Sequence, residues 1–93
     1  MYIRITRGRL DPAKYDQLVS MAKDIEAAVM AAPGCQSYLG GGDRAAGTTV
    51  AVSTWDTEEH ARMTRETALA TIMPRLQAIG IQLDPPEIYE SLV

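Results

Sequence analysis

Residues 49–62 read TVAVSTWDTEEHAR, and this stretch passes from one kind of secondary structure into another without a loop. Its first half alternates small and β-branched residues up to Trp55, which predicts a strand. Its second half is acidic, and Asp56 or Thr57 suits the position that caps a helix. The stretch therefore predicts a strand that leads directly into a capped helix. It also holds the only tryptophan and the only histidine, His60, so it is the first place to look for a site.

The chain before this stretch also predicts a strand followed by a capped helix. Residues 2–9 alternate isoleucine with polar side chains, which predicts a strand with two different faces. Asp11 and Pro12 then suit the start of a helix, and apolar residues recur at spacings of three and four up to Val29. Pro33 and the glycine after it should end that helix.

The remaining elements complete a known topology. Residues 35–40 and 48–55 alternate and should form a hairpin, joined by a flexible glycine-rich turn over 40–47. A second helix should run to Gly80, with Pro74 bending or restarting it, and residues 87–93 should form the last strand. The order predicts an α+β, ferredoxin-like βαββαβ fold, with a four-stranded antiparallel sheet and two helices on one face. We expect one domain over residues 1–93.

Charge and composition narrow the function classes. The net charge is -3 and the nine basic residues form no block, so we expect no nucleic-acid partner. The charged N-terminal segment and the lack of a long apolar run predict no membrane association and a cytoplasmic location. One cysteine and one histidine exclude an intramolecular disulfide and a metal site of nitrogen and sulfur ligands within one chain.

The strand alternation predicts two different sheet surfaces. One set is aliphatic and suits a core beneath the helices, and the other is aromatic and polar and should form the open face. The predicted core set is Ile3, Ile5, Leu39, Val50, Val52, Ile88 and Leu92. The predicted open set is Tyr2, Arg4, Thr6, Gln36, Tyr38, Thr49, Ala51, Ser53, Trp55, Glu87, Tyr89 and Ser91.

An open face that bears a tryptophan and three tyrosines is larger in apolar area than a small monomer usually leaves in water. RNA would need the basic and aromatic signature of an RNA-binding sheet, which is absent. A second copy, related by a two-fold axis, is therefore the expected cover, and the sequence predicts a homodimer formed through this face.

Three segments carry a resemblance to a known family. They are A-A-P-G-C-Q-S-Y at 31–38, V-S-T-W-D-T-E-E-H-A at 52–61 and D-P-P-E-I-Y-E at 84–90. In order and spacing they resemble the antibiotic biosynthesis monooxygenase group of the dimeric α+β barrels, and the likeness spans essentially the whole chain. The resemblance implies the fold and the dimer, and it says much less about the substrate because activities within the group differ.

The resemblance implies oxygen chemistry without a bound cofactor. The group's oxygenases convert electron-rich quinol or anthrol-like phenols to quinones in a pocket between helices and sheet, where dioxygen reacts with the substrate itself, so neither metal nor flavin is expected. Haem-degrading members need an asparagine on the first strand and a histidine well into the second helix. This chain has no asparagine and His60 is too early. Arg65 lies near the haem histidine's position, and we expect it to be a solvated charge on the helix.

Four residues are the catalytic candidates. Trp55 matches the family tryptophan and could stack on a planar substrate, and Tyr38 could orient a phenol oxygen by a hydrogen bond. His60 is the obvious general base if it faces a cavity, and Arg4 could stabilise an anion. The predicted substrate-binding residues are Tyr89, Thr6, Ser53 and Met63.

Each candidate also has a structural interpretation. A tryptophan at a strand end commonly anchors packing, a histidine in a first helical turn is commonly solvated, and interface tyrosines commonly only pack. For Arg4 we favour a protein carboxylate, Glu87 or Glu90, over a bound carboxylate or phenolate. The leading functional hypothesis is a cofactor-independent monooxygenase of a small aromatic compound. The alternative is a non-catalytic, ligand-binding or stress-related dimer.

Overall fold

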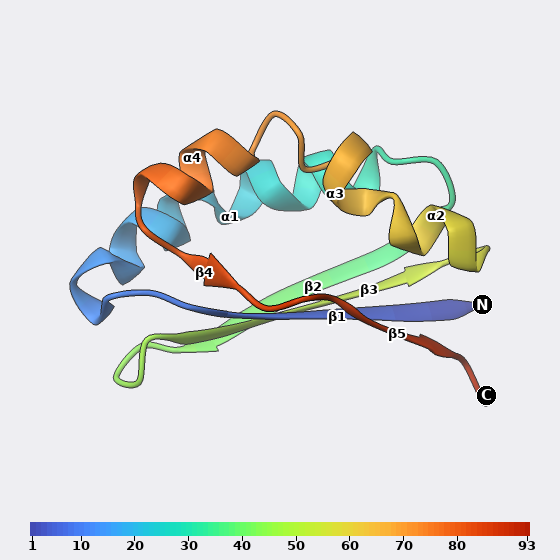
Figure 1. Ribbon diagram of the computed structural model, residues 1–93, viewed down its shortest axis with the longest axis horizontal. Coiled ribbons are helices and arrows are strands. Elements are labelled where there is room, and N and C mark those ends of the chain that lie inside the picture. Colours follow the sequence, from blue (N-terminus) through green and yellow to red (C-terminus); the bar gives the residue numbers. More distant parts are fainter.

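The protein folds into two layers, with an antiparallel sheet below and all helices above it (Figure 1). The computed structural model describes residues 1–93. The strands are β1 (Tyr2–Arg9), β2 (Cys35–Asp43), β3 (Thr48–Trp55), β4 (Gln82–Leu83) and β5 (Glu87–Glu90). The helices are a 3₁₀ turn (Pro12–Lys14), α1 (Tyr15–Met30), α2 (Glu58–Arg62), α3 (Thr64–Thr67) and α4 (Met73–Ala78). The predicted α+β, ferredoxin-like class is confirmed.

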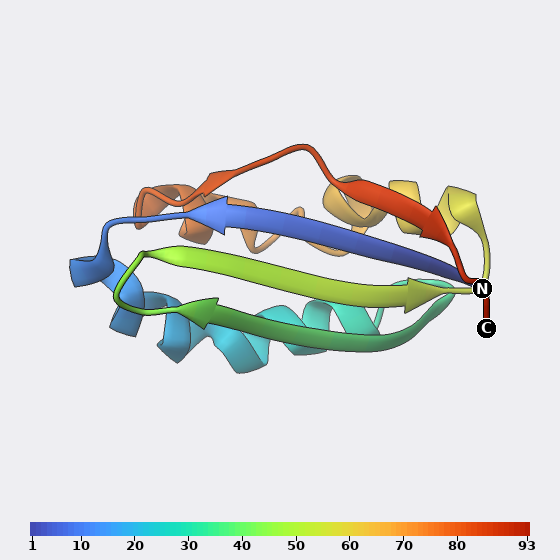
Figure 2. The ribbon, with the colours of Figure 1, turned by 90° about the horizontal axis from the view of Figure 1, so that it is seen from below.

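The sheet order is β2-β3-β1, and both β4 and β5 pair with the far side of β1 (Figure 2). β4 pairs with the end of β1 at Gly8 and Arg9, and β5 pairs with its beginning, from Tyr2 to Ile5. Together they fill the place of the single last strand that the sequence predicted. The prolines at 85–86 separate the two pieces because proline has no N–H for the ladder.

The first helix forms where the sequence predicted it. The Asp11 carboxylate accepts a hydrogen bond from the N–H of Ala13 at 2.9 Å, and Pro12 opens the 3₁₀ turn that leads into α1. Met21 and Val29 are buried on its inner face. No helix combines the length and the apolarity that crossing a membrane requires.

The second helix differs from the prediction, because it is broken into three short pieces. Its start is as predicted, with the Thr57 hydroxyl accepting a hydrogen bond from the N–H of His60 at 3.1 Å. Pro74 lies in the first turn of α4, where it begins that piece instead of bending a longer helix. The break after α2 leaves helix-end carbonyls free, and this matters for the site below.

The predicted glycine-rich turn is also shorter than expected. Gly40, Gly41 and Gly42 lie inside β2, and the turn itself covers residues 44–47. Gly40 has a packing reason, because a Cβ there would come within 3.1 Å of the Tyr38 hydroxyl. The three glycines therefore belong to a strand over which a tyrosine side chain lies, and the prediction that the turn begins at Gly40 was wrong.

The predicted assignment of the sheet faces is wrong for β1, β2 and β3. Arg4 is 3% exposed, Trp55 is fully buried, and both lie beneath the helices with Ser53 and Tyr38. Residues that alternate with them must project from the other, open face. Those residues are Ile3, Ile5, Leu39, Val50 and Val52, the set predicted to form the core. Only β5 was assigned correctly, with Ile88 against the core and Tyr89 51% exposed.

Two physical effects explain the reversal. Trp55 is the largest apolar side chain, and it forms one core with the helix residues Met21, Val29 and Ala61. The polar groups enclosed with it find partners inside, so their burial costs less than the sequence suggested. In β2, an irregularity at Gln36 shifts the alternation, so Cys35 and Tyr38 face the same way.

A candidate binding cavity between the helices and the sheet

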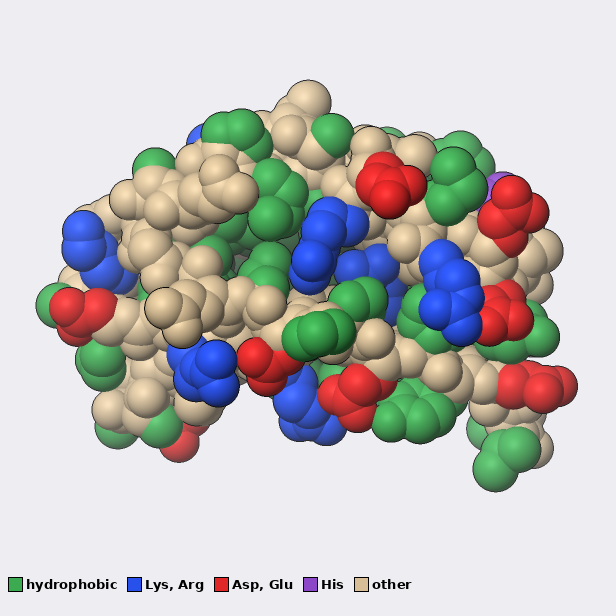
Figure 3. Space-filling model, in the orientation of Figure 1, with side chains coloured by type: hydrophobic (Ala, Val, Ile, Leu, Met, Phe, Trp, Pro, Cys, Tyr) green, Lys and Arg blue, Asp and Glu red, His purple; other side chains and the backbone are tan.

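A cavity of about 380 Å³ lies between the helical layer and the covered face of the sheet. Its volume falls in the usual range for small-molecule sites. Figure 3 shows a recess between the two layers, with hydrophobic side chains deep inside it and Lys or Arg atoms beside it. The apolar wall comes mainly from α1 and from the segment around α4 and β4. It includes Leu18, Val19, Ala22, Ile25, Val29, Leu69, Leu76, Ile81 and Leu83.

The polar lining comes from neighbouring strands. Arg4 and Thr6 on β1, Ser53 on β3 and Tyr38 on β2 line the cavity. Arg4 pairs with Ser53, and Ser53 pairs with Tyr38, in the sheet register, so these three side chains form a row across the covered face. A largely apolar cavity with a few convergent polar groups is the usual form of a ligand site.

Arg4 is held by the end of a helix and not by a carboxylate. Its Nη1 donates to the carbonyl oxygen of Ala61 at 2.9 Å, and its Nε makes a longer contact of 3.4 Å with Thr6 Oγ1. The Ala61 carbonyl is free because α2 ends at Arg62, and a helix C-terminus attracts a cation. Burial lowers the Arg4 pKa from its ordinary value to about 10, and the positive charge of Arg65 contributes to that shift.

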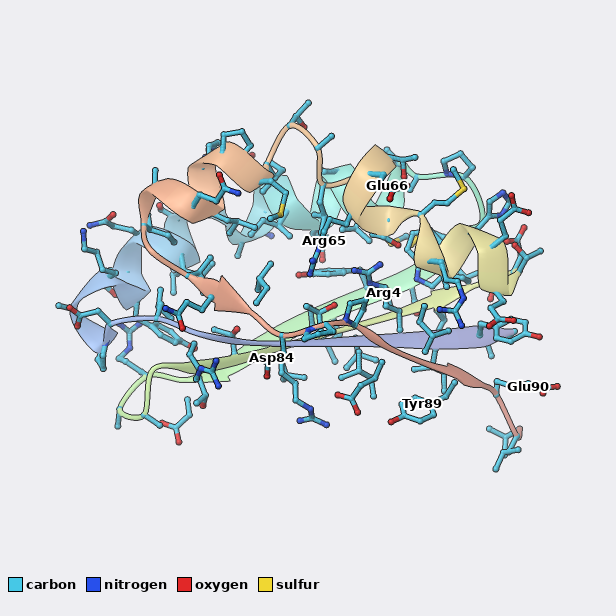
Figure 4. The ribbon with its side chains drawn as sticks, in the orientation of Figure 1. Arg4, Arg65, Glu66, Asp84, Tyr89 and Glu90 are labelled. Carbon is cyan, nitrogen blue, oxygen red and sulfur yellow. The ribbon has the colours of Figure 1, made fainter.

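The carboxylate expected for Arg4 is absent. Glu87 instead accepts a hydrogen bond from Arg7 Nε at 2.9 Å on the open face, and Glu90 makes no ion pair. In Figure 4 the labelled Glu90 lies at the end of the sheet, far from Arg4. The side chain of Glu66 points away from Arg4. Our preference for a protein carboxylate as the partner of Arg4 was therefore wrong.

Arg65 extends from α3 into the space between the layers, towards Arg4 (Figure 4). Its Nε and Nη2 are buried without a hydrogen-bond partner, as is Nη2 of Arg4. The interpretation of Arg65 as a solvated charge was wrong, because the breaks on either side of α3 turn it inward. Two guanidinium groups thus lie close together with no anion between them.

Trp55 lies behind the cavity and does not line it. Its indole Nε1 donates to Ser53 Oγ at 2.8 Å, and Ser53 does line the cavity. The tryptophan therefore fixes the orientation of a cavity hydroxyl and fills the core beside it. Any effect of Trp55 on a ligand would pass through Ser53.

Tyr38 is the aromatic candidate that the structure does bring to the cavity. Burial raises the pKa of its phenol, and the negative charge of Glu26 raises it further. The hydroxyl is consequently neutral near pH 7 and suited to hydrogen bonding, not to proton removal. Glu26, on α1, is the only carboxylate among the residues that line the cavity.

Three other candidates lie outside the cavity lining. His60 Nδ1 is 2.7 Å from Asp56 Oδ1, where the two side chains pair at the start of α2. Tyr89 is on the open face and donates to Glu87 at 2.8 Å (Figure 4). Met63, between α2 and α3, is 39% exposed.

Sequence reasoning missed two residues that line the cavity, Glu26 and Thr64, and it missed the inward direction of Arg65, which does not line the cavity. Thr64 is buried in the cavity wall and donates to the same Ala61 carbonyl as Arg4, at 2.9 Å. Glu26 lies one residue after Ile25 of the apolar stripe, which is a weak signal for the margin of a cavity. Nothing in the spacing marked Arg65, because its direction depends on where the helix breaks. No cluster of three or more His, Cys, Asp or Glu side chains is arranged to hold a metal.

Solved structures share this arrangement over nearly their whole length. Two proteins named "putative antibiotic biosynthesis monooxygenase" match, from Deinococcus radiodurans with TM-score 0.80 and 18% identity, and from Nitrosomonas europaea with TM-score 0.82 and 16% identity. The first match covers 98% of this chain and 92% of the other, and the second covers 100% of both. HapK from Hahella chejuensis matches with TM-score 0.82 and 17% identity, over 99% and 93%.

No protein-family model matches the sequence, and no curated protein does. The solved structures nevertheless define the class: the chain has the fold of the antibiotic biosynthesis monooxygenase-like α+β proteins. The resemblance found in the sequence is confirmed at the level of the fold. At these identities the likeness carries no substrate and no residue roles.

Proposed function

We propose that this protein is a cofactor-independent monooxygenase that acts on a small aromatic, quinol- or anthrol-like compound. One observation carries the proposal: a largely apolar cavity, large enough for such a ring system, places an arginine, a tyrosine and three serine or threonine hydroxyls at its sheet wall. The names of the structural neighbours support the reaction class.

The proposed reaction uses the substrate's own electrons. Loss of the phenolic proton gives an aromatic anion, which Arg4 stabilises because its charge is held in a dry environment. Dioxygen adds at a ring carbon that carries a hydrogen and is conjugated with the phenolate oxygen, which is the carbon opposite that oxygen in an anthrol and the carbon next to the phenolate carbon in a quinol. Cleavage of the O–O bond leaves one oxygen atom as the new quinone carbonyl, and the other departs as water with the ring hydrogen and the phenolic proton.

The proton acceptor is the part of the mechanism that changes most from the sequence hypothesis. His60 does not line the cavity, and the neutral Tyr38 phenol is a poor base. Glu26 is the cavity-lining carboxylate, and its charge acts on Tyr38. We therefore assign proton acceptance to Glu26, directly or through a water molecule, with Tyr38 orienting the phenol oxygen.

Oxygen consumption tests the proposal. Purified protein is mixed with a panel of hydroquinones and anthrols, and oxygen uptake is compared with the uncatalysed rate. Glu26→Gln and Tyr38→Phe should each slow turnover, whereas Asp24→Asn, an exposed carboxylate on the same helix, should not. Absence of uptake above the background rate with every compound would exclude the oxygenase.

A binding protein without catalysis is the second candidate. It is favoured by the absence of histidine from the cavity lining and by the raised pKa of Tyr38, which leave Glu26 as the only proton acceptor there. In that case the same aromatic compounds would bind, with Tyr38→Phe lowering their affinity, and no oxygen would be consumed.

We also propose that the protein forms a homodimer through the open face of the sheet. In the isolated chain this face carries Leu39, which is 74% exposed, together with half-buried Ile3, Ile5 and Val52. Contiguous aliphatic side chains of this kind favour a partner, and identical sheets commonly pair about a two-fold axis. Light scattering at micromolar concentration checks the proposal, and a monomeric mass would contradict it.

A further inference from the structure

The arginines of this chain divide into two groups. Every arginine with an exposed head has a carboxylate partner: Arg7, Arg9, Arg44, Arg62 and Arg75 form ion pairs with Glu87, Asp84, Asp16, Glu58 and Asp24. Arg4 and Arg65, whose donor atoms are buried, have none. Electrostatics alone would give the opposite distribution, since an exposed charge needs no partner and a buried charge does.

The unpaired donors have a specific geometry. Nε and Nη2 of Arg65 lie on one edge of its guanidinium group, and their N–H bonds point in the same direction. That edge matches the two oxygens of a carboxylate. Arg4 contributes a third unpaired donor, Nη2, from the opposite layer, and its other two nitrogens already have partners.

The two guanidinium groups destabilise each other in the absence of an anion. Arg65 is close enough for its charge to lower the pKa of Arg4, and burial lowers it as well. Figure 4 shows Arg65 reaching down from α3 and Arg4 lying above β1, both between the layers. Arg4 lines the cavity and Arg65 does not, so an anion bound between the two heads would lie at the edge of the cavity, with a ring attached to it in the apolar part.

We propose that the ligand of this cavity is an aromatic carboxylate, and that Arg65 and Arg4 together bind its carboxylate group. The inference rests on the proposed ligand cavity and specifies its substrate class. A phenolate offers a single oxygen, and a phenol is neutral near pH 7, so neither satisfies the Arg65 edge and compensates two positive charges. A carboxylate does both, because it is ionised well below neutral pH and has two oxygens.

Matched ligands separate the carboxylate from the ring. The probes are 2,5-dihydroxybenzoate, its neutral amide 2,5-dihydroxybenzamide, and hydroquinone, titrated calorimetrically without oxygen at pH 7. Charge-assisted hydrogen bonds predict that the benzoate binds at least about tenfold more tightly than the amide. Equal affinities for the two, or no binding of the benzoate at about 10 mM, a concentration far above typical ligand dissociation constants, would overturn the inference.

Variants assign the preference to the arginines. Arg65→Gln should remove most of the preference for the benzoate and leave the affinity for the amide unchanged. Arg62→Gln is the matched control, because Arg62 is three residues away, exposed and paired with Glu58. A preference that persists in Arg65→Gln would contradict the assignment. Arg65 is less buried than Arg4, so its substitution keeps the test independent of folding.

Oxygen uptake distinguishes this inference from the proposed function. Turnover of hydroquinone without any preference for the benzoate would overturn the carboxylate site and leave the oxygenase intact. A benzoate preference that depends on Arg65, with no oxygen uptake by any compound, would support the carboxylate site and point to the binding protein.

Discussion

The two faces of the sheet differ in a way that is the reverse of an ordinary two-layer protein. The face beneath the helices carries Arg4, Ser53 and Tyr38 around the cavity, whereas the face open to solvent carries Ile3, Ile5 and Val52. Burial of polar groups costs free energy, and exposure of aliphatic groups forgoes the gain from burial. Such an inversion is stable only if each face has something to bind. We infer a ligand for the covered face and a second chain for the open one.

The largest expected effect concerns the open face. Val52→Lys places a charge at the centre of the aliphatic surface and should convert the proposed dimer to a monomer, because a desolvated lysine would face its own copy across the two-fold axis. Light scattering of the variant measures the mass. Ala27→Lys, on the exposed side of α1, is the control and should leave the mass unchanged. A dimer that survives Val52→Lys would place the interface elsewhere.

Substitution of Arg4 tests the covered face, and it should not destabilise the fold. Arg4→Met keeps the apolar volume and removes an unpaired buried charge, so the free energy of unfolding should stay level or rise by about 1–4 kcal/mol. The Ala61 carbonyl keeps its bond from Thr64. Affinity for 2,5-dihydroxybenzoate should fall at least about tenfold.

Arg7→Met is the matched control for that substitution. Arg7 lies on the same strand but on the opposite face, where its ion pair with Glu87 is exposed. Its removal should cost less than about 1 kcal/mol and leave ligand affinity unchanged. Urea unfolding and calorimetry measure both variants. Strong destabilisation by Arg4→Met would show that the arginine serves the fold and not a ligand.

A smaller effect is expected for substitution of Trp55, which lies behind the cavity. Trp55→Phe leaves a void and removes the hydrogen bond to Ser53, and it should lower the free energy of unfolding by about 1–3 kcal/mol. Ligand affinity should change only modestly, since the indole does not line the cavity. Loss of binding without loss of stability would restore Trp55 as a direct ligand contact.

The smallest effect is expected for Asp56 and His60, which pair at the start of α2, away from both faces of the sheet. The hydrogen bond from His60 holds the pKa of Asp56 below its ordinary value of 3.8. The folded chain therefore binds fewer protons than the unfolded chain around that pH, so this contribution to stability is present above about pH 4 and is lost as the pH falls. Asp56→Asn should therefore reduce the fall in melting temperature that accompanies a decrease in pH from about 5 to about 2.5. An unchanged fall would mean that the pair contributes nothing.

Local signals predicted most of the fold because they act over a few residues. Alternation located β1 and β3, Asp11 and Thr57 cap helices as expected, and the order of elements gave the topology. The second helix was predicted as one piece because nothing in its periodicity marks the breaks around α3. Those breaks turn Arg65 inward.

Alternation also explains the limit on predicting the site. A period of two separates the two faces of a strand but does not say which one the helices cover. We assigned the aliphatic face to the interior, as the usual rule directs, and the rule fails here because the helices cover the face that carries Arg4, Ser53 and Trp55. The grouping of Arg4, Ser53 and Tyr38 on one face was nevertheless right, although the strand register is needed to align them. The same grouping fails for β5, because Ile88 pairs with Arg4 and shares its face.

The sequence by itself determined the order of strands and helices, the caps, and which residues share a face within β1 and within β3, since each depends on neighbours in the chain. The tertiary structure decided which face the helices cover, that His60 and Tyr89 lie apart from Tyr38, and that Arg65 meets Arg4. These outcomes depend on the free energy of packing one layer on another. That free energy is a sum over residues far apart in sequence, and no local pattern contains it.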